Sequence, residues 1–150
     1  MGQSLVKNHI HIVFSTKHRA PLIKKEIRAR LFAYLAEICN QNNSHAIIVG
    51  GHLDHVHILC NLSKSITLAH LIKEIKIHSS KWIKSIGDEY RNFYWQDGYG
   101  AFGVQESSLG FVKNYIQNQE SHHSKINFKH EYKSILDEFG VDFDERYVWE

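Results

Sequence analysis

The sequence predicts an α+β fold in which helices pack on one face of an antiparallel sheet. The chain has 150 residues, of which 43% are hydrophobic, enough for one compact core. It is too short for two domains that each have a sizeable core. Short runs with strand alternation are interspersed with long runs of helical periodicity. Two of the strand-like runs are joined by a connection short enough for a hairpin. We therefore expect one domain over residues 1–150.

The first strand and helix lie near the start of the chain. Residues 9–15 alternate, with Ile12 on a buried face and His9 and His11 on the opposite face. Residues 24–42 repeat apolar side chains at spacings of three and four, which predicts a helix. This unit supplies one strand and one covering helix.

A hairpin follows. Residues 45–49 and 54–61 read as strands, and the glycine-containing segment between them is short. The second strand carries His55 and His57 on one face, while the residues between and beyond them satisfy the core on the other. The histidine face is therefore predicted to be free for chemistry.

The second half predicts three more helices. One spans residues 67–86, and another ends near residue 120. The aromatic, glycine-rich segment 92–104 predicts two short strands around Asp97-Gly98, and residues 128–139 predict a final helix. The element order matches a ferredoxin-like, or RRM-like, antiparallel sheet with an additional C-terminal catalytic helix.

Two pairs of side chains point to chemistry. Residues i and i+2 of a strand lie on one face about 6 to 7 Å apart, so His55 and His57 can bind one metal ion. Residues i and i+4 of a helix are neighbours, so Tyr115 presents a phenol beside the amide of Gln119, whose carbonyl can complete the metal shell. A metal ion beside a tyrosine suggests phosphoryl transfer.

Other histidines compete with this pair, because the chain contains twelve. His9 and His11 form a second pair of the same form. The first and third strands of such a sheet are neighbours, so we expect His9 and His11 beside His55 and His57 on the same face. Ordinary polar sheet positions are the favoured interpretation, with a supporting or DNA-contacting role as the alternative. His122 is a fallback metal ligand, although a solvated position at a helix end is favoured.

Charge is unevenly distributed although the net charge is only +2. Residues 1–91 hold 13 lysines and arginines against 6 acidic residues, and residues 92–150 hold 5 against 10. Such asymmetry can attract a polyanion, although solvated basic helix faces are equally common. Trp82 lies on an apolar stripe and is expected in the core. The candidate DNA-binding residues are Lys17, Arg19, Arg28, Lys73, Lys76, Lys81 and Lys84.

Localisation signals are sparse. No stretch approaches the roughly 20 apolar residues of a membrane span, and the start of the chain does not read as a signal peptide. Cys39 and Cys60 are not in a paired-ligand spacing and fit buried thiols in a reducing compartment. We expect a cytoplasmic protein without membrane association.

Taken together, four segments resemble one known family: residues 11–17 (HIVFSTK), 54–57 (DHVH), 95–99 (WQDGY) and the helix that carries Tyr115. They are similar to the single-tyrosine HUH transposases of small insertion sequences, the insertion-sequence 200-like family. The resemblance covers most of the chain.

This resemblance implies roles for individual residues. Tyr115 is the implied nucleophile, and His55, His57 and Gln119 are the implied ligands of a divalent metal, Mg or Mn. It also implies cleavage and rejoining of single-stranded DNA near hairpins through a 5′-phosphotyrosine. A homodimer is implied, in which the Tyr115 helix of one subunit completes the site of the other.

Two alternatives stay open. The chain could be a housekeeping relative that processes repeated chromosomal palindromes with the same chemistry. It could also be a non-catalytic nucleic-acid-binding ferredoxin-like domain, whose histidines are only sheet residues. Chelators and loss of Tyr115 would not affect DNA binding in the second case.

Overall fold

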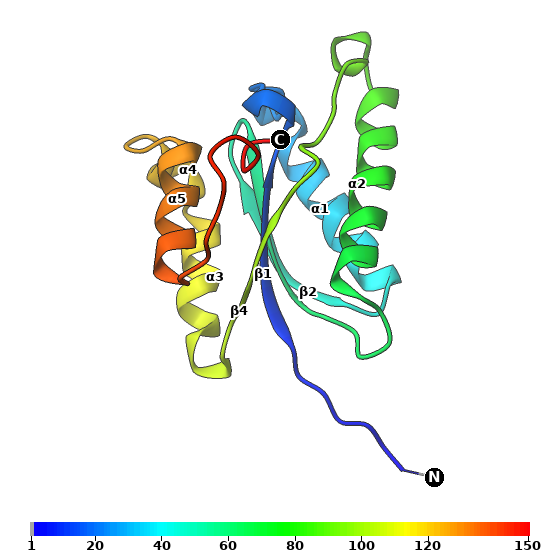
Figure 1. Cartoon of the computed structure of the whole chain (residues 1–150). Helices are drawn as coiled ribbons and strands as arrows, with labels where there is room; N and C mark the ends of the chain where they lie inside the picture. The colour runs from blue at the N-terminus through cyan, green and yellow to red at the C-terminus, as the bar shows by residue number, and fades with distance from the viewer. Residues whose placement is uncertain (1) are drawn as a thin grey trace.

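The protein, described here over residues 2–150 by a computed structural model, is built on a four-stranded antiparallel sheet with the strand order β2-β3-β1-β4 (Figure 1). This is the strand order of a ferredoxin-like fold, so the predicted α+β class is confirmed. The strands are β1 His9–Ser15, β2 His45–Gly51, β3 His55–Asn61 and β4 Gly100–Gly103.

Helices lie on both sides of this sheet (Figure 1). Two of them, α1 Lys25–Gln41 and α2 Leu68–Ser85, form the layer that the sequence predicts. The opposite side carries α3 Leu109–Gln117, α4 Gln119–His123 and α5 Phe128–Glu138. Short 3₁₀ turns are η1 Lys17–Arg19, η2 Asp88–Tyr90 and η3 Glu106–Ser108.

Strand alternation divides the interior into two cores. Ile12 and Ile58 point toward α1 and α2, where they join the larger apolar cluster. Val13, one residue along β1, points the other way and packs with Phe128 and Tyr132 of α5. Both faces of the sheet are therefore buried, and the expectation that the histidine face lies free is wrong. The apolar stripe of α5 needs a partner surface, and this face provides it.

The register of the central strands places the histidines together. His57 of β3 lies opposite Val13, and His11 lies opposite Leu59, two residues further along β3. His11 and His57 are therefore diagonal neighbours on one face. The prediction that both histidine pairs share a face is confirmed for these two side chains.

The segment before β4 differs from the prediction of two short strands. Within the described residues it forms one strand, β4, and a single isolated bridge between Thr16 and Trp95. The intervening loop is held from the side by α2, because the Lys76 ammonium donates hydrogen bonds to the carbonyls of three consecutive residues. These residues are Gln96, Asp97 and Gly98, at 2.8, 3.1 and 2.8 Å.

The cysteines and the character of the helices can also be compared with the sequence analysis. Cys39 and Cys60 are free thiols buried in the larger core, as the sequence predicts. Across residues 2–150, none of the helices combines the length and the apolar character required to cross a membrane.

Close packing between β2 and α3 fixes the position of Tyr115. A Cβ atom on Gly50 would lie 2.5 Å from the carbonyl oxygen and 2.8 Å from the Cγ2 atom of Ile116. Real side chains do not tolerate such distances, and the Ile116 carbonyl belongs to helix backbone that cannot swing away. Gly50 therefore allows α3 to rest directly on the sheet, one residue after Tyr115.

Substituting this glycine is expected to displace the helix. Gly50→Ala should lower the free energy of unfolding by about 1–3 kcal/mol, because the added methyl group overpacks the contact. The matched control is Gly103→Ala, whose Cβ would meet no described atom within 4 Å. Chemical denaturation of both variants measures the difference, and equal stabilities would show that α3 is not held by this contact.

Candidate active site

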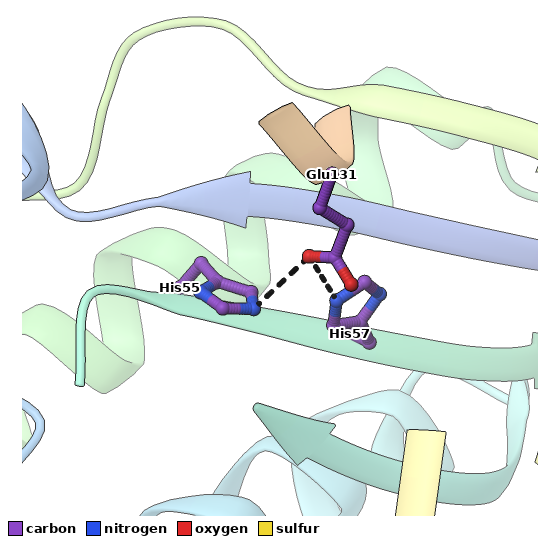
Figure 2. Close-up of side chains that lie close together, drawn as sticks. All are labelled: His55, His57 and Glu131. Atoms are coloured by element: carbon purple, nitrogen blue, oxygen red, sulfur yellow. Dashed lines mark hydrogen bonds and ion pairs between the residues drawn. The ribbon is translucent and has the colours of Figure 1, made fainter. Parts of the chain in front are cut away.

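The centre of the site is the face of β3 that carries His55 and His57, both fully buried. Figure 2 shows Glu131 reaching from α5 toward both imidazole rings. Its Oε1 atom lies 3.3 Å from Nε2 of His55 and 3.2 Å from Nε2 of His57. His123 of α4 adds a third imidazole, with its Nε2 atom 3.0 Å from the same oxygen. One buried carboxylate thus joins three histidines.

The second carboxylate oxygen contacts the other predicted site residues. The Gln119 amide donates to Oε2 of Glu131 at 3.0 Å, and the Tyr115 hydroxyl also donates to this oxygen. The carbonyl oxygen of Gln119 faces Nε2 of His55 at 3.0 Å. The structure therefore brings together all four residues that the sequence singled out, within one chain.

Tyr115 and Gln119 do not share one continuous helix, contrary to expectation. Asn118 has φ −99° and ψ 21°, far from the helical ψ of about −42°, and it separates α3 from α4. Tyr115 lies on the last turn of α3, and Gln119 is the first residue of α4. Both side chains still converge on Glu131.

The outlying histidines extend the cluster. Nε2 of His11 lies 2.8 Å from Nδ1 of His57, so His11 contacts the His55 and His57 pair rather than standing apart from it. His122 was expected in solvent, but its Nε2 atom is buried and lies 3.4 Å from Oε2 of Glu131. The contact between α4 and β2 is the reason, because it holds this short helix against the sheet. His9 instead lies near Glu106, 3.4 Å away.

Burial and the carboxylates set the protonation of the central histidines. Burial lowers the pKa of His55, but hydrogen bonds to Asp54 and Glu131 outweigh it and raise this pKa to about 9. Burial lowers the pKa of His57 below its ordinary value. It also lowers the pKa of His11 to about 3, with the neighbouring His57 adding to the effect. The site thus holds one imidazolium beside neutral imidazoles.

These states determine which nitrogens carry protons. An ionised carboxylate can only accept, so Nε2 of His57 donates to Glu131. The neutral His57 ring then has a free lone pair at Nδ1, and Nε2 of His11 donates to it. A line of donors therefore runs from β1 through β3 to Glu131.

Glu131 and Tyr115 shift in opposite directions. Burial alone would raise the pKa of Glu131, but hydrogen bonds from His123, His55 and His57 hold it far below its usual range. Burial raises the pKa of Tyr115 well above its ordinary value, and the charge of Glu131 raises it further. In this arrangement the phenol is kept protonated.

The donor set fits a divalent cation. The ligand atoms of His55, His57 and Glu131 lie within 4.8 Å of one another, close enough to surround one ion. Two imidazole nitrogens and a carboxylate oxygen are common ligands for transition ions, and the carboxylate also suits Mg and Mn. His122, His123 and Glu131 meet the same distance criterion.

The sequence analysis missed His123, and it also missed Glu131, the central residue of the site. Its signal was present, because Glu131 lies on the same helical stripe as Phe128 and Ile135, both buried. A carboxylate on an apolar stripe is rarely buried without a partner. The prediction of a final helix over residues 128–139 did not use this exception.

The predicted basic residues lie elsewhere. Lys73, Lys81 and Lys84 line a groove of about 560 Å³ along α2, with Tyr99 in its wall. Lys76 also lines this groove, but its ammonium is already bound to three backbone carbonyls. Nζ of Lys84 lies 3.9 Å from the centre of the Tyr94 ring, and Lys17 approaches that ring from the end of β1.

The remaining predicted residues are separate from this groove. The Arg28 guanidinium donates to the carbonyl of Ile23, and Arg19 lies over the Trp149 ring at 5.5 Å. Trp82 packs against the larger core, as expected.

Comparison with known proteins identifies the relatives of this chain. The model of the family described as "Transposase IS200 like" matches residues 4–119. No curated protein matches the sequence. A solved structure from Deinococcus radiodurans R1, described as a putative transposase, is 22% identical with a TM-score of 0.62, covering 79% of this chain and 96% of its own.

A second solved structure is a REP-associated tyrosine transposase bound to a REP hairpin. It is 11% identical with a TM-score of 0.60, covering 84% of this chain and 74% of its own. At such identities, both structures support the fold. The family assignment rests on the sequence match, which spans well over half of the 150 residues. The chain belongs to the IS200-like transposase family.

Proposed function

We propose that this transposase cleaves and rejoins single-stranded DNA at hairpin-bearing element ends, with Tyr115 as the nucleophile. One observation carries the proposal: the Tyr115 hydroxyl adjoins the buried carboxylate that also contacts His55 and His57. A tyrosine beside a cation-binding cluster combines the two parts that this reaction needs. Membership of the family supports the same assignment.

The chemistry follows from the phenol. The Tyr115 oxygen attacks the scissile phosphorus and loses its proton, the new O–P bond forms, and the bond to the departing 3′-oxygen breaks. The products are a 5′-phosphotyrosine and a DNA strand with a free 3′-OH, once that oxygen takes up a proton. Attack by a 3′-OH on the phosphotyrosine reverses the exchange, so strands rejoin without ATP.

His55, His57 and Gln119 would hold the divalent ion, Mg or Mn, and we add Glu131 to this set. Each has a donor atom in the cluster. A bound ion would supply positive charge to polarise the scissile phosphate and to offset the charge of Glu131. His11 orients the His57 ring through its hydrogen bond at Nδ1.

Glu131 also positions the nucleophile. Its Oε2 atom accepts the Tyr115 hydrogen bond and so fixes the direction of the phenol oxygen. The same contact keeps the phenol protonated, because a negative charge beside it disfavours phenolate. The negative charge of Glu131 must therefore be offset before the Tyr115 oxygen can attack.

DNA binding is proposed for the groove along α2. The ammonium groups of Lys73, Lys81 and Lys84 can contact phosphates, and Tyr99 in the groove wall offers a ring for stacking. A structural neighbour was solved with a REP hairpin, which supports hairpin DNA as the substrate class. That neighbour also keeps processing of chromosomal palindromes as a second candidate function.

The arrangement of subunits is a separate proposal. The resemblance implies a homodimer with exchanged tyrosine helices, and the dimer stays a prediction. The contacts described here place Tyr115 against the cluster of its own chain, with its ring centre 5.7 Å from that of His57. We therefore propose that each site acts with its own tyrosine.

The nucleophile can be tested by a denaturing protein gel with labelled single-stranded DNA from the flanks of the gene. Tyr115→Phe should abolish the labelled covalent band but retain DNA binding, because only the attacking oxygen is lost. His57→Ala and chelator should also abolish the band. A band with Tyr115→Phe would contradict the assignment, and metal-independent binding without any band would favour the non-catalytic domain.

Glu131 can be tested through metal binding. Glu131→Gln should weaken Mn²⁺ affinity about 10–100-fold, measured by calorimetry, because the anionic ligand becomes a neutral amide. Glu120→Gln is the matched control, since Glu120 is exposed on the neighbouring helix α4. Unchanged Mn²⁺ affinity in Glu131→Gln would limit Glu131 to positioning Tyr115.

Mixing two inactive variants tests whether Tyr115 acts in the site of its own chain or in that of the partner subunit. Equal amounts of Tyr115→Phe and His57→Ala should form no adduct when combined, because each chain lacks one part of its own site. An exchanged dimer would instead recover about a quarter of the wild-type activity, since half of the dimers are mixed and each has one intact site. Recovery at that level would overturn the proposal.

A further inference from the structure

A second cavity, separate from the lysine-lined groove, opens beside Tyr115. It has a volume of about 730 Å³ and lies between α3, α5 and the end of β4. Tyr115 and Glu131 form part of its wall, so the cavity meets the candidate active site directly. Its size falls within the range of about 300–1,000 Å³ typical of small-ligand pockets.

The walls of this pocket are suited to a flat, mainly apolar group. Phe111 of α3 is 78% exposed, and Phe139 after α5 is 49% exposed. Both line the pocket, together with the apolar side chains of Val112 and Ile135. Exposed aromatic rings at the wall of a cavity are available for stacking on a planar ligand.

The charge of the pocket argues against a phosphate as the occupant. None of the described residues that line it is lysine or arginine, whereas the groove along α2 is lined by four lysines. The carboxylate of Glu138 is in its wall and would repel an anion. A neutral planar group with hydrogen-bond donors is favoured, because carboxylate oxygens only accept.

We propose that this pocket binds the unpaired base of a nucleotide adjoining the scissile phosphate. The inference rests on the proposed function, since it takes Tyr115 as the nucleophile. A phosphate at Tyr115 places its neighbouring base within reach of this cavity, and removal of that base from the stack gives it a free face and edge. Glu138 and Ser134 offer acceptors on the wall, which favours bases with an exocyclic amino group over thymine.

Filling the pocket tests the proposal without altering the reacting residues. Gly103 lines the pocket, and its Cβ would meet no described atom within 4 Å, so Gly103→Leu can project into the space. The matched control is Gly110→Leu, whose position is equally open and is not in the pocket wall. Thermal melting verifies that both variants fold.

The probes are the single-stranded oligonucleotide from the gene flanks and copies with one abasic site at each position around the cleaved phosphate. Fluorescence anisotropy with chelator measures binding without cleavage. Gly103→Leu should weaken binding of the intact oligonucleotide about 10-fold or more, as expected for loss of one stacked base, while Gly110→Leu should not. One abasic position should weaken wild-type binding equally and remove the difference between wild type and Gly103→Leu.

Two results would overturn the inference. Gly103→Leu could bind the intact oligonucleotide as tightly as wild type does, or it could weaken binding to every abasic oligonucleotide by the same factor. Failure of the proposed function gives a different pattern, in which binding shows the expected Gly103→Leu effect but no covalent band forms. Replacing the base with thymine tests the wall acceptors and should weaken wild-type binding less than the abasic site does.

Discussion

The buried carboxylate of Glu131 is the interaction on which the arrangement of the site depends. An isolated charge inside a protein is costly, and losing the partner of a buried ion pair typically destabilises by about 3–5 kcal/mol. Glu131 avoids this cost through His55, His57 and His123 on one oxygen and Tyr115 and Gln119 on the other. These partners come from β3, α3 and α4, so one side chain links three separate elements to α5.

The two faces of the sheet carry different kinds of side chain. The face toward α1 and α2 is packed with aliphatic side chains such as Ile12 and Ile58 and provides a core that contains none of the reacting groups. The opposite face mixes a smaller apolar cluster around Phe128 with the histidines. Because strand alternation separates the two sets, β1 and β3 can hold the histidines rigidly while their other faces stabilise the fold.

The sequence predicted the strands and the faces of their side chains, but it did not predict which helices cover the histidine face. Alternation along β1 and β3 placed His11 and His57 on one face, because a period of two leaves a strand few choices. It could not show that α5 would cover this face, since that depends on a contact between distant parts of the chain. Glu131 was missed for the same reason: a helical stripe reveals that a side chain is buried, but not which groups it meets. The break at Asn118 likewise precedes a helix that contacts β2, a distant partner that the local sequence does not reveal.

For Tyr115 as the proposed nucleophile, the geometry supplies a means of controlling its protonation. Tyr115 donates to a carboxylate whose charge is stabilised by histidines, and both burial and that charge disfavour phenolate. A reactive phenolate would be undesirable in the absence of substrate, whereas a group that brings positive charge to Glu131 would relieve the restraint. The same carboxylate thus positions the phenol and suppresses its reactivity. In the proposed function, activation of Tyr115 is coupled to His55 and His57, because all three side chains contact Glu131.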